Sequence, residues 1–151
     1  MVVEYDGTDF SGWQLQPEQR TVQGALEQAA AQVVGHPVRM RAAGRTDAGV
    51  HAAGQVVVFP CERSLSPAVI QRALNALTGP DIAIREADLV PEDFDPRRSA
   101  RSRLYVYRIW NRPAASPFWA RYVWHIRRKL DVEAMAECAR RLEGEHDFSS
   151  F

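Results

Sequence analysis

The chain has 151 residues, of which 46% are hydrophobic and 25% are charged. These fractions are ordinary for a globular protein in water, and the length allows one large domain, or one and a half small ones, with a real core. No apolar run approaches the roughly 20 residues that a membrane-spanning helix needs. The chain opens directly on a strand-like run at 2–5, so we expect no signal peptide. Cys61 and Cys138 have no CxxC partner, which favours reduced thiols and a cytoplasmic protein.

The charges are unevenly distributed, although the formal net charge is zero. Ten basic residues and no acidic residue lie between Arg97 and Lys129, a stretch that we call the basic stripe. The flanking stretches 81–96 and 131–147 hold six acidic residues each. Since local fields govern association more than net charge does, this segregation predicts a surface that can bind phosphates.

The first ninety residues alternate between strand-like and helix-like patterns. Thr21 predicts the N-cap of a helix from Val22 onward, which Gly35 ends. Ser66 and Pro67 predict the start of a second helix, which Gly79 and Pro80 end. Apolar runs predict strands at 2–5, 38–42, 55–59 and 82–87. The resulting β-α-β-β-α-β order predicts an α+β fold of the ferredoxin type, which RRM-type RNA readers share.

The remaining residues predict the start of a second, similar half. A long strand is expected at 103–110 and a short one at 122–125. Asp131 is expected to cap a helix that ends at Gly144. The acidic, proline-bearing stretch 91–96 lies before these elements, so we expect two parts, residues 1–96 and an incomplete 97–151.

The segment between the second and third predicted strands combines features of a site. It holds Gly44 and Gly49, with Asp47 between them, Arg45 two residues upstream and His51 four residues downstream. Glycines permit backbone angles and close approaches that a side chain forbids, and loops carried by strands present functional groups. The local pattern leaves an alternative open, in which Asp47 only bonds its own backbone in a tight turn.

The residues Gly-Arg-Thr-Asp-Ala-Gly-Val-His-Ala at 44–52 resemble the signature of the TruA family of tRNA pseudouridine synthases. Further segments resemble landmarks of that family in the same order: 4–14, 21–27, 103–107 and 144–151. The resemblance implies the pseudouridine synthase fold, with a central and largely antiparallel sheet. It also implies isomerisation of uridine to pseudouridine in the anticodon stem-loop of tRNA, by a homodimer.

The resemblance implies that Asp47 is the essential carboxylate. Such a group must be ionised and shielded from water, because a solvated carboxylate is a weak nucleophile. Arg45 is placed to keep Asp47 charged or to hold a phosphate, with a structural ion pair as the alternative. His51 is a candidate base or phosphate contact, although a loop histidine bonding the backbone is favoured.

Tyr105 matches the family's tyrosine that lies against the target uracil. In a strand, Arg103, Tyr105 and Tyr107 would share one face, and core packing is favoured for Tyr107. Arg97 matches an arginine near the bound nucleotide, and Arg103 is a further substrate-binding candidate. Asp95-Pro96 and Arg98 replace the family's usual neighbours of that arginine, which puts its contacts in doubt.

No cofactor is expected, because the isomerisation changes no redox state, and no metal-ligand spacing occurs. Two alternatives stay open: a non-catalytic RRM-like RNA-binding module and, more weakly, metal-dependent hydrolysis through Asp47, His51 and His146. The resemblance implies about a hundred further residues with another basic active-site residue. We therefore expect this chain to behave as a fragment, with little isomerase activity and a tendency to self-associate.

Overall fold

The computed structural model describes residues 1–150, which form two compact units. The first unit comprises Met1–Arg103 and the second begins at Leu104. Each unit is described by itself.

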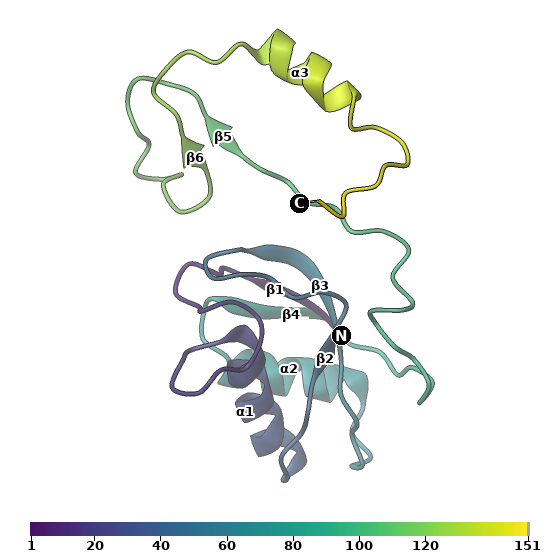
Figure 1. Ribbon diagram of the computed structural model, residues 1–151. Helices are drawn as coiled ribbons and strands as arrows, with labels where there is room; N and C mark the ends of the chain where they lie inside the picture. Colours follow the sequence, from purple (N-terminus) through teal and green to yellow (C-terminus); the bar gives the residue numbers. More distant parts are fainter. Residues whose placement is uncertain (151) are drawn as a thin grey trace. The chain divides into compact units, whose positions relative to one another are not determined.

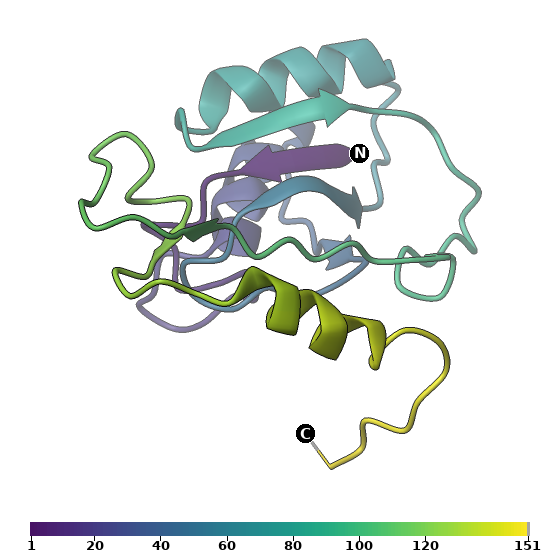
Figure 2. The same ribbon diagram turned by 90° about the horizontal axis from the view of Figure 1, so that it is seen from above.

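The first unit is a four-stranded antiparallel sheet with two helices on one of its faces (Figure 1). The strand order is β2-β3-β1-β4, and Figure 2 shows β1 running between β3 and β4. The elements follow the predicted β-α-β-β-α-β order, which confirms the α+β fold. In chain order they are β1 (Val2–Tyr5), α1 (Val22–Val34), β2 (Arg41–Ala42), β3 (Ala52–Val58), α2 (Pro67–Leu77) and β4 (Ile82–Glu86).

Both helices begin at the residues that the sequence predicts. The Thr21 side chain accepts a hydrogen bond from the Gly24 N–H, and the Ser66 side chain accepts one from the Val69 N–H. Each bond satisfies an N–H that the helix itself leaves unpaired. Gly35 ends α1 in the left-handed conformation, at φ 84°, which an L side chain rarely adopts.

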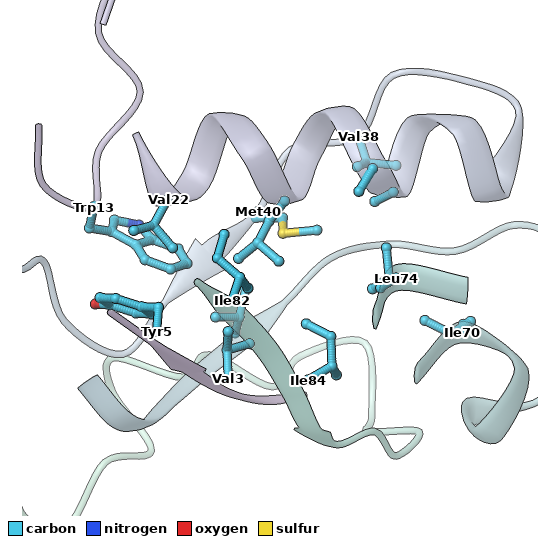
Figure 3. Close-up of a cluster of buried hydrophobic side chains, with 14 of the residues drawn as sticks. Val3, Tyr5, Trp13, Val22, Val38, Met40, Ile70, Leu74, Ile82 and Ile84 are labelled. Carbon is cyan, nitrogen blue, oxygen red and sulfur yellow. The ribbon is translucent and has the colours of Figure 1, made fainter. Parts of the chain in front are cut away.

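The core lies between the helices and the covered face of the sheet (Figure 3). Leu26 of α1 and Leu74 of α2 are fully buried there, together with Val3 and Val57 of the two central strands. Burying one such side chain stabilises the fold by roughly 1.5–3 kcal/mol. This single cluster therefore holds both helices on the sheet.

The predicted strand at 38–42 is only partly formed, since β2 contains Arg41 and Ala42 alone. The backbone of Met40 is bonded by helix side chains instead: its N–H donates to Glu27 Oε1 (2.8 Å) and its carbonyl accepts from Gln23 Nε2 (3.2 Å). These polar side chains of α1 satisfy groups that a neighbouring strand would otherwise pair. The sheet edge is consequently short.

The opposite edge of the sheet, along β4, is covered by amide side chains of α2. Asn75 donates to the Ile84 carbonyl (3.0 Å) and accepts from the Ile84 N–H (2.7 Å). Gln71 Nε2 donates to the carbonyls of Ile84 (3.1 Å) and Arg85 (2.7 Å). Backbone groups that an edge strand leaves unpaired are thus satisfied within the unit.

The second unit has little regular structure in the described residues. The strands β5 (Ile109–Trp110) and β6 (Trp124–His125) pair in parallel, and α3 (Val132–Arg140) follows, capped by Asp131. The predicted strand 103–110 is wrong up to residue 108, because only the last two residues have a strand partner in the part of the chain described. The helix also ends before the predicted Gly144. Among residues 1–150, no helix is both long and apolar enough for a bilayer.

Candidate active site

The segment 44–51, which we call the signature loop, joins β2 to β3. Its first residue is held by an amide side chain: Gln55 Nε2 donates to the Gly44 carbonyl (2.7 Å), and the Gly44 N–H donates to Gln55 Oε1 (3.4 Å). Immediately before it, the Ala43 N–H donates to the Val56 carbonyl (2.9 Å). The loop therefore leaves the sheet from a fixed point.

The loop after β1 packs directly on the signature loop. The Trp13 N–H donates to the Thr46 carbonyl (2.9 Å), and the Gly49 N–H donates to the Phe10 carbonyl (3.3 Å). The Trp13 ring is itself buried against the Tyr5 ring, with centroids 6.2 Å apart (Figure 3). A buried aromatic thus anchors one backbone bond to the signature loop.

Two glycines allow the two loops to approach this closely. A Cβ added at Gly7 would lie 2.1 Å from the Val50 carbonyl oxygen, and one added at Gly12 would lie 2.7 Å from the Thr46 carbonyl oxygen. Gly12 also has φ 87°, in the left-handed region. Any side chain at either position would push the loops apart.

Tyr5 supports the signature loop from inside the core. Its hydroxyl bonds to Thr46 Oγ1 (2.8 Å), and the ring is only 3% exposed. Burial raises the pKa of Tyr5, while hydrogen bonds with Thr46 and Gln55 oppose the rise. Tyr5 is therefore a neutral hydroxyl near neutral pH, available to donate or accept.

Asp47 follows Thr46 and faces outward. Its main-chain carbonyl accepts from the Val50 N–H (3.2 Å). The side chain is exposed, and within residues 1–150 its carboxylate has neither a hydrogen bond nor an ion pair. The expected pairing of Arg45 with Asp47 is not formed in this structure, nor does the Asp47 side chain bond its own backbone. The loop thus presents a carboxylate that is open to a ligand, and the shielding from water expected for it is not present in the described residues.

His51 ends the signature loop beside the first loop. Its Nδ1 lies 3.1 Å from both the Gly7 nitrogen and Asp6 Oδ1. One ring nitrogen accepts from the Gly7 N–H only when it carries no proton, and donates to Asp6 only when it does. We assign the Gly7 bond, because a backbone N–H is always a donor. His51 then has the backbone-bonding role that the sequence favours.

The segment 95–103 is tied to the same region through Arg103. Its Nη2 donates to the carbonyls of Ala43 (2.8 Å) and Arg97 (3.2 Å). Asp95 Oδ1 accepts from the N–H groups of Arg97 and Arg98, both at 2.9 Å. The Arg98 bond, followed by that of Arg97, holds the pKa of Asp95 below its ordinary value. Arg103 thus acts as a backbone tether, while the Arg97 side chain stays exposed.

Tyr105 belongs to the second unit, where it is 69% exposed, and its stacking role stays a prediction. The structure adds three residues that sequence reasoning missed, Tyr5, Thr46 and Gln55. The available signal was weak: Gln55 is the polar residue at the start of the apolar run 55–59.

No three His, Cys, Asp or Glu side chains within residues 1–150 gather as a metal site. His146, the third member of the hydrolytic alternative, lies in the second unit, with its Nε2 2.8 Å from the Glu143 carbonyl oxygen. The metal-dependent alternative therefore gains no support from the side-chain geometry.

A ferredoxin-like domain that exposes a carboxylate and arginines on its loops is suited to bind a polyanion such as RNA and to place the carboxylate near it. The family model described as tRNA pseudouridine synthase matches residues 1–97, more than half of the chain. The chain therefore belongs to the tRNA pseudouridine synthase family.

Curated relatives extend the similarity over the whole chain. A tRNA pseudouridine synthase A from Geobacter sulfurreducens is 46% identical over 151 residues, and one from Rhodopseudomonas palustris is 47% identical over 152 residues. One from a Methylobacterium species is 48% identical over 152 residues. The alignments cover 100% of this chain and 62%, 62% and 61% of those proteins, so the chain spans about three fifths of their length.

Proposed function

We propose that the protein isomerises uridine to pseudouridine in tRNA, with Asp47 as the carboxylate that starts the reaction. The main supporting observation is that the Asp47 carboxylate is unpaired within residues 1–150. The loop that carries it is hydrogen-bonded before Asp47, at Gly44 and Thr46, and after it, at Gly49. Membership of the tRNA pseudouridine synthase family supports the same proposal. It also favours an enzyme over a non-catalytic RNA-binding module.

The reaction exchanges one glycosidic bond for another. The bond between the sugar C1′ and the base nitrogen breaks, the base turns, and C1′ bonds to a base carbon. That carbon loses its hydrogen and the freed nitrogen gains one, so substrate and product have the same atoms. No oxidant or reductant is consumed, and we propose that no cofactor takes part. Asp47 attacks or stabilises the reacting centre as an ionised group.

We propose that the anticodon stem-loop is the target and that a homodimer binds it in the cytoplasm. The target base must leave its stack, which costs a few kcal/mol. Phosphate contacts from the exposed Arg45 and Arg97 offset part of this cost, and His51 adds a polar contact. Arg103 supports the contact of Arg97 by bonding the carbonyls of Ala43 and Arg97. Tyr105 stacks on the extruded uracil, which is worth about 1–3 kcal/mol per base.

The test is pseudouridine formation in tRNA by the intact protein and by its Asp47→Asn variant. This change keeps the side chain's shape and removes its charge, so we expect turnover to be abolished while folding and tRNA affinity stay near normal. Asp93→Asn is the matched control, because Asp93 is an exposed aspartate outside the signature loop. Turnover by Asp47→Asn above a small fraction of the parent rate would refute the role of Asp47.

Omitting added metal tests the cofactor proposal separately. The parent protein should retain its rate in a chelator once the tRNA has been folded beforehand. Loss of the rate, restored by a divalent ion at constant tRNA fold, would contradict cofactor-free isomerisation.

A further inference from the structure

The two central strands carry polar side chains on the covered face of the sheet, beside the signature loop. Tyr5 of β1 is 3% exposed and Gln55 of β3 is 9% exposed. Both strands otherwise contribute apolar side chains to the core, such as Val3 and Val57. A buried polar group destabilises a fold unless it is hydrogen-bonded. The hydrogen-bond partners of the Tyr5 hydroxyl and the Gln55 amide therefore indicate what these two side chains do in the fold.

Both side chains direct their polar atoms at the residues just before Asp47. The Tyr5 hydroxyl bonds to Thr46 Oγ1 at 2.8 Å. The Gln55 amide bonds to both backbone groups of Gly44, at 2.7 and 3.4 Å. The Thr46 carbonyl is held in addition by the Trp13 N–H, at 2.9 Å.

We propose that Tyr5 and Gln55 are positioning residues, which fix the place on the loop from which the Asp47 side chain projects by holding Gly44 and Thr46 from the core. The inference rests on the proposed function of Asp47. Within residues 1–150 no side chain bonds the carboxylate itself. The backbone therefore fixes where the Asp47 side chain begins, and the bonds at Gly44 and Thr46 are the side-chain bonds nearest to Asp47 on its upstream side. A misplacement of about 1 Å at a reacting group can cost as much as 100-fold in rate.

The kinetic test uses Tyr5→Phe and Thr46→Val, alone and combined, in the intact protein. Each change removes one hydroxyl of the same hydrogen bond. We expect each to lower kcat about 10-fold with little change in KM, because the substrate contacts remain. The double variant should lose no more than the larger single effect, since both changes remove one shared bond. Thr46→Ser keeps the hydroxyl and should restore most of the rate.

Thr78→Val is the matched control. Its hydroxyl also bonds backbone carbonyls, those of Leu74 (2.9 Å) and Ile82 (3.3 Å), but it lies at the end of α2. We expect it to lower thermal stability about as much as Thr46→Val does, and to leave kcat unchanged. An equal loss of kcat in Thr78→Val would reduce the effect to general destabilisation and overturn the proposal.

Amide hydrogen exchange supplies a readout that does not depend on activity. Tyr5→Phe and Gln55→Met should increase exchange in the signature loop at least several-fold, while exchange in α2 stays at the parent rate. If the loop amides do not change, Tyr5 and Gln55 do not hold the loop, and the proposal fails even if Asp47 is catalytic. If the loop loosens but the parent forms no pseudouridine, the loop anchor stands and the proposed function fails.

Discussion

The two units of this chain differ in how they use their apolar residues. The first buries sixteen hydrophobic side chains in one cluster, all between residues 3 and 84. In the second, no residue from 104 to 150 is buried, and Leu104, Tyr107 and Phe118 are each more than 80% exposed. Ordering a residue costs about 1–2 kcal/mol of backbone entropy, which only burial on the scale of the first unit can offset.

The two units also differ in their charged residues. Six of the ten cations of the basic stripe lie beyond residue 103, in the unit whose described residues, 104–150, form no buried core. The first unit, in contrast, holds the presented carboxylate on a loop bonded to two strands and a neighbouring loop. A rigid unit suits a catalytic group that needs fixed geometry, whereas phosphate contacts tolerate a less ordered one.

The largest expected effect separates the two units directly. In hydrogen exchange on the 151-residue chain, amides of β1, β3 and α1 should be protected to the level of global unfolding. Amides after residue 104 should exchange with little protection, because their elements have few buried contacts. The difference should reach several kcal/mol. Comparable protection in α3 and α1 would show that the second unit is stabilised by something other than a buried core.

The same comparison explains how well the sequence predicted the fold. The caps Thr21, Ser66 and Asp131 are local signals, and all three helices begin where the sequence placed them. Strands depend on a neighbouring strand, which periodicity does not reveal. The run 103–110 therefore has the pattern of a strand but little pairing, and 38–40 is bonded by Gln23 and Glu27 of α1 instead.

The site was predicted to a similar extent. The glycines and the carboxylate of the signature loop were evident because their spacing is local. Tyr5 lies 41 positions from its partner Thr46, and Gln55 lies 11 positions from its partner Gly44. These residues contact the loop only once the sheet has formed, so local spacing does not reveal them. Of the two roles predicted for Arg45, the pairing with Asp47 assumed that two residues of separation bring the charges together, and the exposed loop does not do so; the phosphate-binding role stays a prediction.

A smaller effect distinguishes the functional loop from the rest of the rigid unit. Gly12→Ala and Gly35→Ala both place a side chain at a positive φ, 87° and 84°. Each should cost about 1–2 kcal/mol in stability from the backbone conformation alone. Only Gly12→Ala adds a clash, with the Thr46 carbonyl oxygen, whereas nothing lies within 4 Å of a Cβ at Gly35.

We therefore expect Gly12→Ala to reduce pseudouridine formation well beyond its effect on thermal stability. Gly35→Ala should change stability only. Equal activity of the two variants, measured below their melting temperatures, would show that the contact between the two loops is not needed for turnover.

The charged character of the second unit can be tested through salt dependence. Replacing Arg127 and Arg128 by glutamine should flatten the slope of log tRNA affinity against log salt by about one to two units, if each contacts a phosphate. Arg140 and Arg141, which lie outside the basic stripe, are the control pair. A slope that changes only in the control pair would place the RNA away from the stripe.

The smallest effect concerns Asp95, in the segment 95–103 that ends the first unit. The pKa of Asp95 is lowered in the folded state by bonds from the Arg98 and Arg97 N–H groups. Its contribution is therefore present above the ordinary carboxyl pKa of about 3.9, and is lost as the pH falls through the lowered value. Chemical shifts of the two amides should report this loss below about pH 4. In Asp95→Asn that titration should vanish, and if it persists, another group is responsible.

The amide side chains along β4 have a consequence for how this protein can associate. Asn75 supplies both a donor and an acceptor to Ile84, as an incoming strand would, and Gln71 donates to the carbonyls of Ile84 and Arg85. A strand from another molecule would have to displace these bonds before it could extend the sheet. The α2 side chains therefore block strand addition at the β4 edge of the sheet. Association through the first unit is left to its loops, its surface side chains or the short edge at β2.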